Sequence, residues 1–130
     1  MRRIILSASL TLGLFSILLA QNPSYAPDAG WHAPDAARAR LNPLATRPGA
    51  VRGGEKLFRR NCAECHGQDG TGMVKKHSAD FHLPEVQEQT DGTLFWKITN
   101  GNADRGMPSF SKLPELERWQ LVLYLRTLKP

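Results

Sequence analysis

Cys62-Ala63-Glu64-Cys65-His66 places two thiols three residues apart, with an imidazole directly after the second thiol. On the last turn of a helix, residues at i and i+3 lie on one face. Both thiols can then reach one flat group, and the next side chain lies under the centre of that group. The chain has no further cysteine, so this stretch decides what the fold is built around.

The spacing C-x-x-C-H is the pattern by which haem c is attached to a protein. Each thiol adds to one of two vinyl groups at adjacent edges of a porphyrin, and the adjacent histidine offers a ring nitrogen to the iron. We therefore predict that Cys62 and Cys65 hold one haem c covalently and that His66 binds its iron.

Three other interpretations of the two cysteines compete with this one. A thioredoxin-like redox disulfide needs a βαβ context, and none is visible. A zinc site needs a second ligand pair at similar spacing, and His77 and His82 lie at no usual motif distance. A structural disulfide between Cys62 and Cys65 is possible in an exported protein, but it leaves His66 unexplained.

A haem iron used for electron transfer needs a second axial ligand, and methionine raises its reduction potential. Met73 lies only seven residues after His66, too close to cross to the other face of the ring. Met107 lies 41 residues after His66, beside Pro108, which fixes the local backbone. We predict Met107 as the ligand. The histidines that could compete, each expected to be an ordinary surface residue, are His32, His77 and His82.

Hydrophobic periodicity predicts three helices and no strands. The first covers about residues 50–61 and is followed by a glycine-rich loop at 67–72, where glycine permits positive φ. The second covers about 92–99, with Asp91 as its N-cap. The third runs from about Pro114, at its first position, to about Leu128.

The chain resembles the class I monohaem cytochromes c of the bacterial periplasmic type over roughly residues 50–130, with the motifs in the expected order. The matching stretches are Gly54-Glu55-Lys56-Leu57-Phe58, Cys62-Ala63-Glu64-Cys65-His66-Gly67, Leu94-Phe95-Trp96-Lys97-Ile98-Thr99-Asn100-Gly101, Gly106-Met107-Pro108-Ser109-Phe110, and Trp119 through Leu128.

The resemblance implies an all-α fold, a small cytochrome c fold with about three to four helices around one haem c. The first and last helices should cross. Gly54 would allow their close approach, and Phe58 would meet Leu121 and Tyr124 at the crossing. The resemblance also implies Met107 as the sixth ligand.

The predicted function is electron transfer between periplasmic redox partners through a haem with His66 and Met107 as axial ligands. One alternative is a cytochrome c subunit of a periplasmic dehydrogenase or reductase complex. A less favoured one is a haem enzyme or gas sensor with a labile sixth ligand. The expected apolar pocket residues are Phe81, Leu94, Phe95, Trp96, Ile98, Phe110 and Trp119. The expected propionate donors are Trp119, Arg105 and Lys97.

The charge balance favours redox proteins as partners, namely a dehydrogenase, an oxidase or a membrane complex. The 130 residues carry 17 basic and 12 acidic side chains, a net charge of +5. Without Arg2 and Arg3 this becomes 15 against 12, or +3, which two propionates largely offset. No basic cluster exceeds two residues, so nucleic acid is not expected as a partner. A positive rim for an acidic partner would use Lys75, Lys76, Lys97 and Arg105.

The N-terminal third divides into two segments. Residues 1–20 have a short positive start and an apolar run, typical of a signal peptide or an N-terminal membrane anchor. Residues 21–48 form a Pro/Ala-rich arm or linker, which Trp31 and Leu41 could pin to the cytochrome c domain at 49–130. We therefore expect a periplasmic protein with a possible N-terminal membrane tether.

Overall fold

The computed structural model of the chain describes residues 25–130. Within that range the chain is all-helical: extended strands are absent, and one isolated antiparallel bridge joins Asn102 to Met107. The long helices are α2 (Pro48–Asn61), α5 (Asp91–Asn100) and α6 (Glu115–Thr127). The short helices are α1 (Asp35–Arg38), α3 (Ala63–His66) and α4 (Pro84–Gln87), with the 3₁₀ turns η1 (Val74–Lys76) and η2 (Ala103–Arg105).

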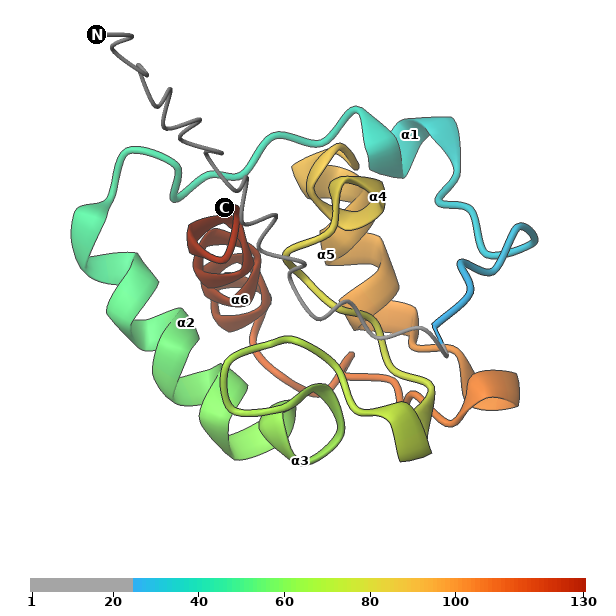
Figure 1. Cartoon of the computed structure of the whole chain (residues 1–130). Coiled ribbons are helices and arrows are strands. Elements are labelled where there is room, and N and C mark those ends of the chain that lie inside the picture. The colour runs from blue at the N-terminus through green and yellow to red at the C-terminus, as the bar shows by residue number, and fades with distance from the viewer. Residues whose placement is uncertain (1–24) are drawn as a thin grey trace, which may run out of the picture.

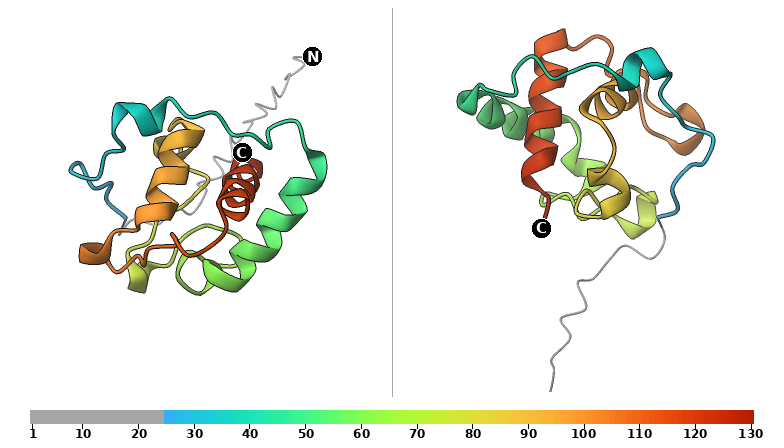
Figure 2. Two further views of the ribbon diagram at one scale, coloured as in Figure 1. Left: turned by 180° about the vertical axis from the view of Figure 1, so that it is seen from behind. Right: turned by 90° about the horizontal axis from the view of Figure 1, so that it is seen from above.

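The first long helix crosses the last one, as predicted (Figures 1 and 2). A Cβ atom added at Gly54 of α2 would lie 2.0 Å from the backbone oxygen of Gln120 in α6. Only glycine therefore allows the two backbones to come this close. Phe58, fully buried, packs its ring 5.1 Å from that of Tyr124, and Leu121 lies in the same core cluster.

Two helix starts differ from their predictions. Thr90, not Asp91, caps α5, because its hydroxyl accepts a hydrogen bond from the Thr93 amide at 3.1 Å. Threonine at this position satisfies an amide that has no partner within the helix. Pro114 has an extended ψ of 144° and is the N-cap of α6, not its first helical residue.

A stacked pair of buried aromatic rings joins α5 to α6 within the core. The rings of Phe95 and Trp119 lie 4.0 Å apart at 18°. The guanidinium groups of Arg40 and Arg118 lie over the Phe95 ring at 4.6 and 4.8 Å. Attraction between each cation and the ring adds to the apolar burial at this junction.

Residues 25–47, which we call the N-terminal strap, pack along the helical domain past α5 and α6 (Figure 1). The strap is fixed at its far end by Asn42, whose amide donates to the Trp119 carbonyl at 3.1 Å. In its middle, α1 lies against α5, since a Cβ at Gly92 would meet the Ala37 carbonyl at 2.0 Å. Trp31 anchors the strap as predicted, whereas Leu41 is 87% exposed and does not.

The predicted signal peptide or membrane anchor at 1–20 lies outside the described residues. Within 25–130, none of the helices combines the length and apolar character needed to cross a membrane.

Candidate functional site

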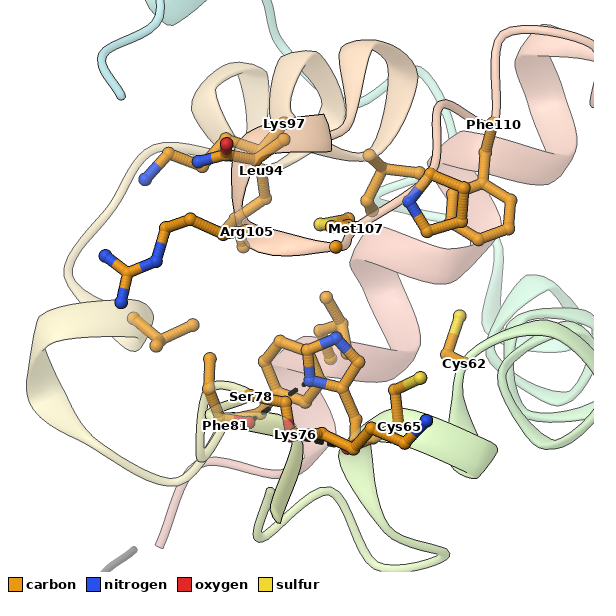
Figure 3. Close-up of a pocket in the computed structure, with 18 of the residues that line it drawn as sticks. Cys62, Cys65, Lys76, Ser78, Phe81, Leu94, Lys97, Arg105, Met107 and Phe110 are labelled. Atoms are coloured by element: carbon orange, nitrogen blue, oxygen red, sulfur yellow. Dashed lines mark hydrogen bonds between the residues drawn. The ribbon is translucent and has the colours of Figure 1, made fainter. Parts of the chain in front are cut away.

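A cavity of about 470 Å³ opens between the C-x-x-C-H turn, α5, the loop before α6 and the strap (Figure 3). Its size lies within the range of about 300–1,000 Å³ that is usual for ligand and cofactor sites. All four residues predicted as cofactor ligands line it: Cys62, Cys65, His66 and Met107.

The cysteine wall is a single helical turn. The amide of Cys65 donates to the Cys62 carbonyl at 3.1 Å and that of His66 to the same oxygen at 2.9 Å. These bonds hold the two thiols and the imidazole on adjoining positions of one wall. Both cysteines are half-buried and free.

The redox and zinc interpretations of the two cysteines can be compared with the structure. Burial raises the pKa of the Cys62 thiol to about 12, with a smaller contribution from Cys65. The thioredoxin-like interpretation needs a βαβ context, and residues 25–130 are helical without strands, so that interpretation loses support. The zinc interpretation has no ligand set either, because residues 25–130 contain no group of three or more His, Cys, Asp or Glu side chains placed to hold a metal ion.

The imidazole of His66 is oriented by two neighbours. Its Nδ1 atom lies 3.2 Å from the carbonyl oxygen of Ala79, which can only accept, so Nδ1 carries the proton and Nε2 keeps its lone pair. The ring stacks on Phe81 at 4.5 Å. Burial, the main cause, lowers the pKa of His66. A neutral, oriented imidazole with one bonded ring nitrogen is the form that ligates metals.

Met107 lies across the cavity from Cys65 (Figure 3). The backbones of Met107 and Asn102 exchange two hydrogen bonds of 2.9 Å, which hold the loop that carries the thioether. Pro108 also lines the cavity, whereas Met73 does not and is 38% exposed. The geometry therefore agrees with the choice of Met107 over Met73.

The three histidines that could compete as iron ligands differ in their position relative to the cavity. His32 and His82 do not line the cavity. The Nδ1 atom of His82 lies 2.9 Å from the Asp80 carboxylate. His77 is exposed, as expected of a surface residue, and it also contributes to the cavity lining after η1, with a left-handed φ of 49°. It stays in competition with Met107 as a second ligand.

The apolar walls are partly as predicted. Residues that line the cavity as expected are Phe81, Leu94, Ile98 and Phe110. Residues that do not are Phe95, Trp96 and Trp119. Phe95 lies on the other face of α5, against Trp119. The Trp119 indole is 1% exposed and its N–H points to the Glu115 carboxylate at 3.4 Å, so its predicted role as a propionate donor is wrong.

Cationic groups gather at one end of the cavity. Lys97 and Arg105 lie at the end away from Cys62 and Phe110 (Figure 3). The Lys97 ammonium lies 4.6 Å from the centre of the Trp31 ring. Burial lowers the pKa of Lys97.

Among the cavity residues that the sequence did not single out are Tyr25 and Asp28 of the strap. The one signal that could have found them was Trp31, a large aromatic residue in an arm otherwise rich in proline and alanine.

These features fit a haem c. Two thiols and an imidazole share one wall, a thioether faces them, the flanks are apolar, and cations lie at the end away from the thiols. In haem the two carboxylates lie at the edge opposite the vinyl groups, which matches this separation of charge and thiol.

A family model described as cytochrome C oxidase, cbb3-type, subunit III matches residues 49–125, which is more than half of the chain. A comparison with curated proteins gives no significant match.

Proposed function

Because the chain belongs to the cbb3-type cytochrome c oxidase subunit III family, we propose that its cavity holds the haem through the four residues brought together there. Membership makes the chain a c-type cytochrome with a covalently bound haem c. Its function is haem-mediated electron transfer, as an electron carrier or an oxidase subunit and not as an enzyme of its own.

We assign Cys62 and Cys65 as the attachment points, and His66 and Met107 as the axial ligands. The observation that carries this assignment is the cavity with thiols and imidazole on one wall and a thioether facing them. The carbonyl of Ala79 keeps the proton on Nδ1 of His66, so that Nε2 is the ligating nitrogen.

A haem c at this place supplies one-electron chemistry, its iron alternating between ferrous and ferric. The residues around the haem control its exposure to water, its reduction potential and the balance of charge. Leu94, Ile98 and Phe110 exclude water from the ring, and a thioether from Met107 raises the potential by favouring ferrous iron. Lys97 and Arg105 offset the charge of the carboxylates.

The partners are redox proteins, with oxidase complexes as the kind that the family suggests. We propose that encounters use the cations at the cavity, Lys76, Lys97 and Arg105, which steer an acidic docking surface. The family description favours a subunit of a terminal oxidase as the second candidate function, over a dehydrogenase or reductase subunit. Co-purification of an oxidase with the tagged chain separates the subunit from a free carrier.

The family match supports a proposal for the compartment. Proteins of the cytochrome c family are typically exported, and we propose the periplasm, with residues 1–20 as signal peptide or tether. The proposed domain at 49–130 is supported by a family match that begins at residue 49.

The attachment is tested on the full-length protein, matured in cells that make c-type cytochromes. After extraction with acidified acetone, we expect the reduced spectrum of haem c to stay with the polypeptide and an equilibrium redox titration to fit a one-electron step. Transfer of all the colour into the acetone would contradict covalent attachment.

A further inference from the structure

The N-terminal strap lies before the family match, which begins at residue 49, yet it forms part of the cavity wall. Tyr25, Asp28 and Trp31 all line the cavity. Asn42 and the contact of Ala37 with Gly92 hold the strap to the helical domain elsewhere. The strap is therefore a fixed element beside the cavity.

Two side-chain hydrogen bonds connect the strap to the end of α5. The Trp31 indole N–H donates to the Gly101 carbonyl at 3.1 Å. The Asn102 amide donates to Oδ2 of Asp28 at 2.9 Å. The other oxygen of Asp28 accepts from the Gly30 amide at 2.9 Å, which sets the orientation of the carboxylate.

Gly101 and Asn102 are the residues against which the Met107 loop is built. Asn102 exchanges two backbone hydrogen bonds with Met107. Gly101, at φ +66°, has so little space that a Cβ would lie 2.5 Å from the Pro108 carbonyl carbon. A movement of the Met107 loop would therefore disturb Gly101 and Asn102, the two residues that the strap holds.

We propose that Asp28 and Trp31 are positioning residues for Met107, acting through Asn102 and Gly101 to keep its thioether on the iron. This inference rests on the proposed role of Met107 as axial ligand. The two hydrogen bonds favour the state in which the loop is closed, so their loss raises the population with an open sixth position.

The test uses the full-length holoprotein with carbon monoxide, which binds ferrous haem only when the sixth position opens. We expect Asp28→Ala and Trp31→Phe each to raise the carbon monoxide association rate about fivefold, the scale of one hydrogen bond. Trp31→Phe keeps a smaller aromatic ring for Lys97 and removes the indole N–H donor. Asp28→Asn, which keeps one acceptor oxygen, should give an intermediate rate.

Asp35→Ala is the matched control. It removes a strap carboxylate of the same type, 99% exposed and paired with Arg38 on the strap itself, and should leave the rate at the wild-type value. If Asp28→Ala fails to fold, Trp31→Phe decides the question.

Failure of this inference differs from failure of the ligand assignment. Met107→Ala is measured beside the strap variants, through the charge-transfer band between thioether and ferric iron. Survival of that band in Met107→Ala would overturn the assignment itself. Loss of the band in Met107→Ala, together with wild-type carbon monoxide rates in Asp28→Ala and Trp31→Phe, would overturn the positioning role alone.

Discussion

The Nδ1 atom of His66 and the carbonyl oxygen of Ala79 lie 3.2 Å apart, although the two residues are 13 positions apart in the sequence. The loop between them reaches this contact through glycines with positive φ, among them Gly67 and Gly72. The Gly72 amide donates back to the His66 carbonyl at 2.8 Å. The same loop that leaves the C-x-x-C-H turn thus returns to fix the imidazole on it.

Replacement of the attachment cysteines should release the haem. We expect Cys62→Ala to lower the amount of haem that stays with the polypeptide, because one thioether bond remains at most. The double variant Cys62→Ala/Cys65→Ala should lose its haem to acidified acetone, and the absorbance of the extracted protein measures this. A normal haem content in the double variant would refute the attachment.

Met107→Ala should remove the thioether-to-iron charge-transfer band at the red end of the ferric spectrum. The reduction potential should also fall, because the ligand that favours ferrous iron is lost. Met73→Ala is the control and should keep both values, since Met73 does not line the cavity.

His77 decides what replaces Met107. If Met107→Ala stays unreactive towards carbon monoxide, His77 has taken the sixth position, and Met107→Ala/His77→Ala should become reactive. Persistence of the charge-transfer band in Met107→Ala, with its loss in Met73→Ala, would move the assignment to Met73.

Gly54→Ala should destabilise the protein by about 1–3 kcal/mol, the usual cost of inserting a carbon atom into a well-packed contact. The neighbour is backbone, the Gln120 carbonyl at 2.0 Å, so no side-chain rotation relieves the clash. Gly49→Ala, in the same helix with nothing within 4 Å, should be neutral or stabilising by about 0.5–1 kcal/mol. Urea unfolding of the two holoproteins measures the difference, and equal midpoints would contradict the close crossing.

The contact of the strap with α6 should weaken in acid. Hydrogen bonds from Arg40 first, then Trp119, lower the pKa of Glu115 from its ordinary value of 4.5. A lowered pKa in the folded state means stabilisation that is complete above pH 4.5 and is lost as the pH falls through the folded value. Glu115→Gln should therefore be less stable than wild type at pH 7, with the difference shrinking below pH 4.5.

Glu117→Gln controls for charge near the start of α6, because Glu117 lies in the same first turn. Thermal unfolding at several pH values separates the two variants. An equal pH profile for Glu115→Gln and Glu117→Gln would show that Arg40 contributes nothing specific.

Features that depend on local sequence were predictable. The C-x-x-C-H turn and the helices α2 and α6 could be predicted, because each is encoded by a pattern within one continuous stretch of chain. The resemblance to class I cytochromes c placed Gly54 at the helix crossing. The side of α5 that faces the cavity was harder to predict. Both faces of this helix are apolar, so the sequence did not distinguish Leu94, which lines the cavity, from Phe95, which packs on Trp119.

The strap was not predictable from composition. Its proline and alanine content is typical of a linker, and four of its side-chain hydrogen bonds are made with residues 70 to 77 positions away in sequence. Such partners leave no periodic pattern in the strap itself. His77 is exposed, as predicted, but its second position at the edge of the cavity was not predictable, because no local pattern indicates its left-handed φ of 49°.

The long sequence separation of the strap contacts also orders events during biogenesis. Trp31 and Asp28 find their partners only after residues 101 and 102 exist, and Arg40 only after Glu115 has been synthesised. Contacts that close such long loops form late, because the entropy of closure is offset only when the helices are in place. We therefore expect the strap to be the last wall of the cavity to form, so that a flat prosthetic group would reach the site from that side before the strap closes.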